Sequence, residues 1–249
     1  MKNNLKYIGV FALVAVIILP TTTFAARSES TVRNAGTQFC ATLDKRATEV
    51  NSKIDDKKEK LDIRQHDRLN KKSADRSERD TKLEMHRDGW DDHRGERITK
   101  LEAKATTDAQ KAAVAQFNTT MTAAINARRS AIDTAISTFR TGVDSITGTR
   151  VSAVDTAIAT FKTARQSALE KAKTDCAAGV DSKTAKATFE ASMKAALNTF
   201  KAAKTAVIKK NDVTVLSQAR KAAIEKAVAD FKVTMDAAQA TLKLAFPKP

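Results

Sequence analysis

The sequence repeats itself at a fixed interval. Residues 130–141 read SAIDTAISTFRT and residues 152–163 read SAVDTAIATFKT, and Phe117, Phe139 and Phe161 keep the same interval. Between these phenylalanines the apolar positions advance in steps of 4, 4 and 3, so each copy contains two 11-residue repeats, or hendecads. A hendecad has 3.67 residues per turn, so its apolar stripe stays on one face of a nearly straight helix. The repeat therefore predicts a long helix with a hendecad-type coiled-coil seam.

This apolar seam crosses Gly142 and Gly148 without a change of phase. Each glycine costs about 1 kcal/mol relative to alanine inside a helix, but a loop at either position would reset the phase. We therefore predict one unbroken helix over about residues 108–178, within a segment 106–180. At 1.5 Å per residue, this helix would be roughly 100 Å long.

The rest of the chain contains few residues that favour loops. Six of the seven glycines follow residue 25, and the only prolines beyond that point are Pro247 and Pro249. An all-α fold with few, long helices is expected. Gly179 follows a basic stretch and predicts a helix C-terminus, after which Asp181 or Ser182 caps a C-terminal helical arm over 181–249. The apolar register of this arm slips near 210–213, where we predict a kink.

The N-terminal half is densely charged but nearly balanced. Residues 27–105 hold 20 basic and 17 acidic side chains, whereas residues 106–249 hold 22 and 12, within a total formal charge of +15. The stretch 62–97 is almost wholly charged. Ion pairs three or four residues apart, each contributing roughly 0.2–0.5 kcal/mol, can hold such a stretch helical. We predict a charged helical arm over 26–105, and the sequence leaves open whether 62–97 is ordered.

Residues 1–25 have the pattern of a secretory signal peptide. Lys2 and Lys6 precede an apolar run over 8–19, and small residues follow at the end of the segment. The run is shorter than the roughly 17–25 residues that span a bilayer, which disfavours an uncleaved anchor. We predict a signal peptide over 1–25, an extracytoplasmic location (periplasm, cell envelope or secreted) and no transmembrane segment after cleavage.

The two cysteines, Cys40 and Cys176, lie at equal sequence distances from Asp108. The polar stretch 105–109 favours a turn at that point, with Thr107 or Asp108 capping the following helix. A long antiparallel helical hairpin that turns there brings the two sulfurs together, and an exported protein favours their oxidation. We predict an intramolecular disulfide, which contributes about 4–5 kcal/mol in the chain-entropy model; free thiols and intermolecular bridges are the alternatives. With the C-terminal arm laid back along the hairpin, the expected shape is an elongated three-helix rod.

Three arginines, Arg128, Arg150 and Arg165, interrupt the apolar seam. One interpretation is that their aliphatic stems pack in the seam while the guanidinium groups reach solvent or an acidic partner helix. The alternative is a line of anion contacts.

The chain offers little that points to catalysis or metal binding. His86, Asp92 and His93 surround the only tryptophan, Trp90, and offer nitrogen and oxygen ligands, but they match no metal-site motif. His66 lies in a charged stretch without a nucleophile placed by any motif. We predict no catalytic residue, no cofactor and no metal site, and therefore no enzyme, with metal binding by His86 and His93 left as an open question.

These observations favour an exported, non-enzymatic coiled-coil protein with a structural, spacer or protein-interaction role in the cell envelope. The expected partner is another protein or a second copy of the chain. The alternative is a cationic binding module, either a holdase-like chaperone or a nonspecific binder of acidic polymers. The only tyrosine precedes residue 26 and the phenylalanines lie largely on the seam, so no sequence-specific nucleic-acid partner is expected.

Overall fold

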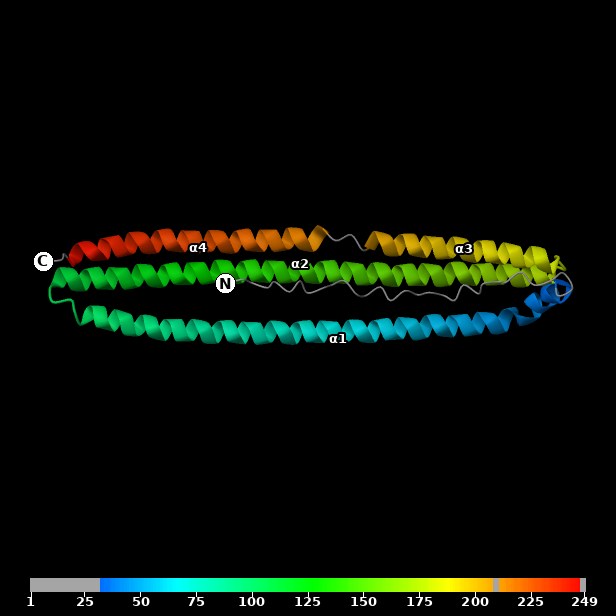
Figure 1. Cartoon of the computed structure of the whole chain (residues 1–249), viewed down its shortest axis with the longest axis horizontal. Coiled ribbons are helices and arrows are strands. Elements are labelled where there is room, and N and C mark those ends of the chain that lie inside the picture. Colours follow the sequence, from blue (N-terminus) through cyan, green and yellow to red (C-terminus); the bar gives the residue numbers. More distant parts are fainter. Residues whose placement is uncertain (1–31, 208–210, 247–249) are drawn as a thin grey trace. The chain divides into compact units, whose positions relative to one another are not determined.

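The protein is all-α. The computed structural model describes residues 32–207 and 211–246, and over these residues it contains four helices and no strand. They are α1 (Val32–Glu102), α2 (Asp108–Ala177), α3 (Ser182–Val207) and α4 (Asn211–Ala245) (Figure 1). The predicted signal peptide over 1–25 lies outside the described residues, as does part of the predicted kink near 210–213. Within the described part of the chain, no helix is long and apolar enough to cross a membrane.

Helix α2 runs through both glycines of the repeat without a break. At Gly142 a Cβ atom would lie 2.7 Å from Cδ1 of Leu216 in α4, so the missing side chain makes room for that leucine. At Gly148 a Cβ atom would meet nothing within 4 Å. Only Gly142 therefore has a packing reason to be glycine.

Helix α1 includes the whole charged stretch 62–97. It ends at Glu102, and residues 103–107 connect it to α2. The side chain of Gln110 accepts hydrogen bonds from the backbone N–H groups of Thr106 and Thr107, and the hydroxyl of Thr107 accepts one from the N–H of Gln110. This reciprocal arrangement is a capping box, and it satisfies backbone donors that a helix N-terminus leaves free.

The end of α2 is set by Gly179, the only described residue with a positive φ, at 75°. The N–H of Gly179 donates to the carbonyl of Cys176, and the N–H of Val180 donates to the carbonyl of Asp175. This is the left-handed helix end that glycine adopts without steric cost. Asp181 then caps α3, because its carboxylate accepts the N–H of Thr184.

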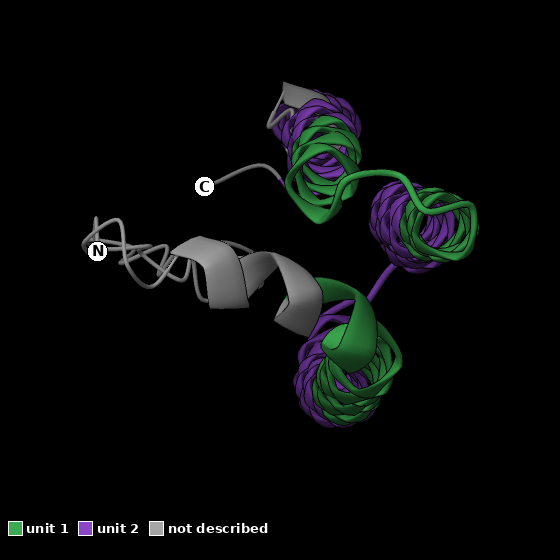
Figure 2. Cartoon of the chain, turned by 90° about the vertical axis from the view of Figure 1, so that its right-hand side faces the viewer, with its two compact units in different colours: residues 1–69, 162–195 green, residues 70–161, 196–249 purple. Residues whose placement is uncertain are grey.

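The chain divides into two compact units (Figure 2). Unit 1 comprises residues 1–69 and 162–195, and unit 2 comprises residues 70–161 and 196–249. In each unit the contacts of α1 with α2 run in opposite directions along the two sequences, so the two helices are antiparallel there. The rod shape and the coiled-coil seam remain predictions.

Unit 1 has a small, closed apolar core. Side chains from α1, α2 and α3 form one buried cluster: Phe39, Leu43, Ala47, Leu169, Ala172 and Ala185. The rings of Phe39 and Phe189 lie 5.8 Å apart at its edge. Cys40 and Cys176 also pack against this cluster and form a disulfide, as predicted.

Unit 2 is packed differently. Near the α1–α2 turn, Val114 is fully buried, and Phe117 is nearly so. At the other end of the unit, the rings of Phe161 in α2 and Phe200 in α3 lie 5.6 Å apart. Between Phe117 and Ile158 of α2, and along α4, the large apolar side chains are half-buried or exposed, among the half-buried ones Ile125, Ile132, Ile136, Ile224 and Met235. In the middle of unit 2, the buried apolar residues of α2 and α4 are therefore alanines, and the larger apolar side chains stay partly exposed.

Candidate interaction surfaces

A ladder of ion pairs joins α1 to α2 in unit 2. It contains four guanidinium–carboxylate pairs whose shortest N–O distances lie between 2.6 and 2.8 Å: Arg76–Asp144, Asp80–Arg140, Arg87–Asp133 and Asp91–Arg129. In each pair the guanidinium donates to both carboxylate oxygens. Two parallel hydrogen bonds fix geometry better than a single lysine contact does. Lys72 adds a second cation to Asp144 at 2.6 Å.

The ladder has the same hendecad period as the apolar seam. Each helix contributes one arginine and one aspartate, one helical turn apart, in each of two hendecads. The paired residues on α2 run backwards as those on α1 run forwards. A slip of one turn in one direction would place Arg76 opposite Arg140, and in the other direction Asp80 opposite Asp144. Because like charges would then meet, the ladder specifies one register.

Three of the four ladder carboxylates are held in the charged form. The pKa of Asp144 is lowered to about 2, chiefly by the hydrogen bonds from Arg76, with Lys72 contributing in the same direction. Hydrogen bonds from Arg140 and Arg129 likewise lower the pKa values of Asp80 and Asp91. A hydrogen bond donated to the ionised form favours that form. These aspartates therefore serve as counter-ions at neutral pH.

Unit 1 repeats the hendecad spacing with lysines. Asp44 pairs with Lys173 at 2.5 Å, and Asp55 pairs with Lys162. Between these pairs lies Arg165, of which only 6% is exposed. Its guanidinium donates to the carbonyl of Ala47 and to the side-chain oxygen of Asn51. Burial lowers the pKa of Arg165.

A second kind of contact joins α2 to α4 in unit 2. The guanidinium of Arg128 in α2 lies 4.1 Å from the ring centre of Phe231 in α4, and that of Arg220 in α4 lies 4.2 Å from the ring centre of Phe139 in α2. On each helix the arginine and the phenylalanine are separated by one hendecad. Both guanidinium groups therefore make cation–π contacts across the interface. Over residues 39–206 and 213–246, no carboxylate pairs with either of them.

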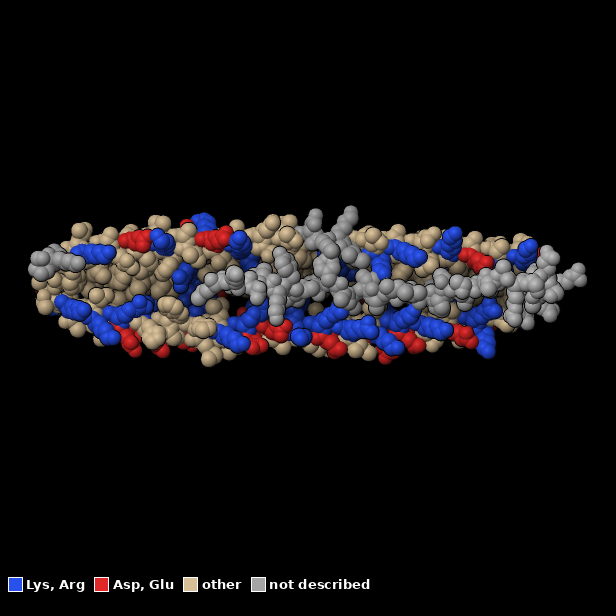
Figure 3. All heavy atoms as spheres, in the orientation of Figure 1, with Lys and Arg blue, Asp and Glu red and all other residues tan. Residues whose placement is uncertain are grey.

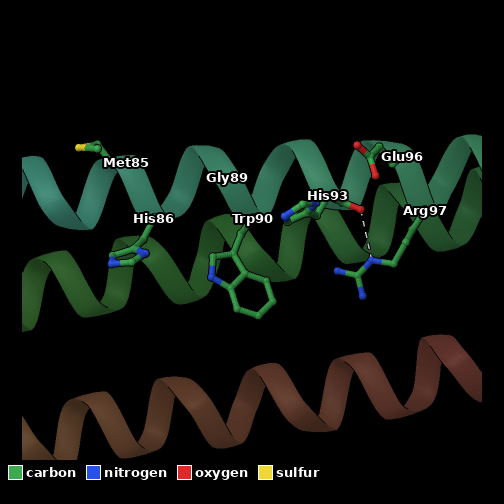
Figure 4. A pocket seen from close by; sticks show the side chains of 7 residues that line it. All are labelled: Met85, His86, Gly89, Trp90, His93, Glu96 and Arg97. Carbon is green, nitrogen blue, oxygen red and sulfur yellow. Dashed lines mark hydrogen bonds between the residues drawn. The ribbon is translucent and has the colours of Figure 1, made fainter.

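The Trp90 surface lies on a different face of α1 from the ladder. It comprises Met85, His86, Trp90, His93 and Arg97, and a shallow hollow lies among these side chains (Figure 4). Trp90 is 68% exposed and Met85 is 67% exposed. Arg97 donates from Nε to the backbone carbonyl of His93 at 3.3 Å. Large exposed aromatic side chains of this kind are common at protein–protein contacts.

The candidate metal ligands are not gathered into one cluster. His86, Asp92 and His93 belong to no group of three or more histidine, cysteine, aspartate or glutamate side chains that could hold a metal ion within the described residues. His86 and His93 instead lie beside Trp90, as Figure 4 shows.

The three seam arginines lie in different surroundings. Arg165 belongs to unit 1 and is bonded to neutral oxygens of α1. Arg128 and Arg150 belong to unit 2, where Arg128 stacks on Phe231 and Arg150 is half-buried. The guanidinium groups of Arg128 and Arg165 pair with no described carboxylate, and Arg165 is not at the surface. The interpretation that the heads extend into solvent or toward acids therefore does not describe Arg165.

Sequence reasoning missed the ladder. It predicts that the charged residues of α1 pair along their own helix, as Lys58 and Asp62 do. The signal is nevertheless present: Arg76 and Arg87, and Asp80 and Asp91, repeat at the period of the seam. A search for hendecad spacing among charges, and not only among apolar residues, would have found it.

Together these features define an all-α protein whose helices are joined by repeating ionic and cation–π contacts. No known family model, curated protein or solved structure matches the chain.

Proposed function

We propose that this chain is an exported, non-enzymatic helical protein with a structural and protein-interaction role in the cell envelope. The ladder carries the proposal. It commits two arginines and two aspartates of the densely charged arm to holding α1 on α2 in one register. Hydrogen bonds within the ladder lower the pKa values of Asp80, Asp91 and Asp144. Such groups are suited to fixing an assembly, and poorly suited to proton transfer near neutral pH. The exposed Trp90 surface then supplies a place for a partner.

An in-cell experiment tests this role. The chain, tagged at its C-terminus and expressed from its own promoter, is followed by fractionation and by amine-reactive crosslinking of intact cells. We expect the tagged chain in the extracytoplasmic fraction, in adducts of discrete mass that contain one other protein. Retention in the cytoplasm with residues 1–25 uncleaved would refute the export step. A diffuse smear that disappears in high salt would refute the specific interaction.

A second candidate function is a cationic binding module. It is favoured by the formal charge of +15 and by exposed lysines such as Lys194, Lys201 and Lys243, which have no carboxylate partner among the described side chains. Lysine contacts to a polyanion release counter-ions, so the affinity falls steeply with salt.

Heparin chromatography and client protection distinguish the two functions. A binding module predicts late, salt-dependent elution that moves earlier in Lys201→Gln/Lys243→Gln, or suppressed aggregation of a heated client enzyme at stoichiometric ratios. A structural role predicts no client protection, and heparin elution that is no later than that of an unrelated protein of equal net charge.

A further inference from the structure

Unit 2 has an apolar surface that its own helices leave partly uncovered. In α2, Ile125, Ile132 and Ile136 lie on the helical wheel between the ladder residues, which contact α1, and Arg128 and Phe139, which contact α4. All three isoleucines are half-buried. The corresponding positions of α4 are Ile224 and Met235, also half-buried, and Val228, which is 47% exposed. A closed core would bury such side chains almost completely, as unit 1 does with Leu43 at 4% and Leu169 at 6%.

The arrangement of the helices explains this exposure. Figure 2 shows that, within unit 2, α2 lies between α1 and α4. In unit 2, α1 contacts α2 through the ladder, and α4 contacts α2 through the arginine–phenylalanine pairs. Among the described residues of this unit, no described hydrogen bond, ion pair or ring contact joins α1 to α4. We name the surface of α2 and α4 on the side toward α1 the open face. Figure 4 shows the Trp90 indole projecting from α1 on the side toward α4, at the edge of this face.

The charges of the open face are predominantly positive. Arg128 and Arg220 are half-buried, with rings beneath them and no described carboxylate as partner. Burial, together with the nearby charges of Arg129 and Arg87, lowers the pKa of Arg128. Arg97 adds a cation at the rim, where Glu96 is the only acidic residue lining the hollow. Along the helix axis, Arg128 and Arg220 are separated by one hendecad, or about 16 Å at 1.5 Å per residue.

The charged side chains are distributed unevenly over the surface around the open face. In Figure 3, blue and red side chains alternate along α1 and along the outer edge of α4, whereas the visible surface of α2 near the α1–α2 turn is largely uncharged. A ligand that fits this face must be apolar along its length and must carry negative charge at two separated points. A flexible polyanion could pair with the positive charges of the open face but would leave its apolar side chains uncovered. An amphipathic helix with acidic side chains can pair with the charges and also cover the apolar side chains.

We propose that the open face of unit 2 binds an amphipathic helix of a partner protein that carries two carboxylates one hendecad apart. Its apolar stripe covers the isoleucines of α2 and the side chains of Ile224 and Met235. Its carboxylates pair with Arg128 and Arg220, and the indole of Trp90 packs against one side of the bound helix. This inference rests on the proposed interaction role and specifies where and by what chemistry the partner is recognised.

The test uses synthetic peptides and the purified, oxidised chain from residue 26. The first peptide is a helix-forming 25-mer with an apolar hendecad stripe and two glutamates one hendecad apart. The second has the same composition with the glutamates moved to one heptad apart, and the third has lysines in place of the glutamates. Binding is followed by calorimetry and by the fluorescence of Trp90, which is the only tryptophan of the chain.

We expect the first peptide to bind with a blue shift of the Trp90 emission and at least tenfold more tightly than the other two. Arg128→Gln/Arg220→Gln should weaken the first peptide at least tenfold, and Trp90→Ala severalfold. Lys226→Gln/Lys232→Gln is the matched control, because it removes two exposed charges of α4 that pair with Asp230 and Asp236 of the same helix. Its affinity for the peptide should not change.

Equal binding of all three peptides, or an equal loss in the control variant, overturns the proposed recognition. So does the absence of binding up to about 1 mM peptide, an affinity of only about 4 kcal/mol. Sedimentation of the free chain tests the other occupant: a dimer that Trp90→Ala dissociates shows a second copy on the open face and refutes the proposal. The crosslinking experiment is independent, so discrete adducts without peptide binding would leave the interaction role standing and remove only this site.

Discussion

Units 1 and 2 use the same hendecad spacing with different chemistry. In unit 1 the three helices meet around buried phenylalanine, leucine and alanine side chains, and a disulfide joins α1 to α2. In unit 2, α1 is held on α2 by charged groups, and α4 is held on α2 partly by arginine–phenylalanine contacts. The period of a helical repeat therefore determines where contacts fall, and the residue types at those positions determine whether the contact is closed and apolar or open and ionic.

Removing the disulfide is the largest expected perturbation, and it should act on unit 1. Cys40→Ser/Cys176→Ser should lower the unfolding free energy of this unit by about 4 kcal/mol, because the unfolded chain regains a long unconstrained loop. Denaturant unfolding followed by circular dichroism should show an early transition, while Trp90 fluorescence, which reports on unit 2, should change midpoint much less. Reduced wild-type protein is the control and should match the variant. A common shift of both signals would show that the two units unfold as one.

Truncation of one core side chain in each unit should separate the two kinds of packing. Leu43→Ala in unit 1 should cost about 3 kcal/mol, since it leaves a cavity in a closed cluster. Ile136→Ala in unit 2 should cost about 1 kcal/mol, because its side chain is already half in water. The measurement is the denaturant midpoint of each variant. Equal losses would contradict the open packing assigned to unit 2.

Two glycine substitutions in unit 2 sharpen the comparison within α2. Gly148→Ala should raise stability by about 1 kcal/mol, because alanine is the better helix former and its Cβ meets no atom within 4 Å. Gly142→Ala should be less stable than Gly148→Ala by at least about 1 kcal/mol, because Leu216 must move. Thermal melts of the two variants beside the wild type measure the difference. If both variants gain the same stability over the wild type, Leu216 of α4 does not pack closely against α2 at Gly142.

The ladder should have the smallest effect, and it depends on pH. The folded-state pKa of Asp144 is about 2, below its ordinary value, so its stabilisation is complete above about pH 4 and is lost as the pH falls toward 2. At pH 7, Asp144→Asn should cost only roughly 0.5–1 kcal/mol, because the carboxylate is 47% exposed and solvent screens the pair.

Trp90 fluorescence during urea unfolding at pH 7, 4 and 2 measures this dependence. Asp144→Asn should flatten the acid slope of unit 2 and reduce its dependence on salt. Asp80→Asn, which removes the partner of Arg140, should behave similarly because the hydrogen bond from Arg140 lowers the pKa of Asp80, whereas Asp236→Asn on the exposed side of α4 should not. A slope unchanged in Asp144→Asn would show that other carboxylates control the acid response.

Much of the backbone could be predicted from local signals. Apolar periodicity predicts an unbroken α2, the capping residues at Thr107 and Asp181 follow from their side chains, and the equal distances of the cysteines from Asp108 lead to the disulfide. Each of these depends on neighbours in sequence or on one covalent constraint. The ladder depends on a match between two distant segments, and a charged side chain looks the same in sequence whether its partner is water or another helix. The exposure of Trp90 depends on which side of α1 the other helices leave uncovered, and no local pattern encodes that.

The alternating charges of the ladder also have a mechanical consequence. Under a shearing force along the axis of unit 2, α1 cannot shift along α2 by one helical turn at a time, because every such shift places like charges opposite each other. The next arrangement that restores opposite charges, such as Arg87 opposite Asp144, lies a full hendecad away, about 16 Å along the helix. The short connection at 103–107 is too tight to allow that displacement. The helix pair should therefore resist sliding up to a threshold force and then separate abruptly, although each of its ion pairs is individually weak.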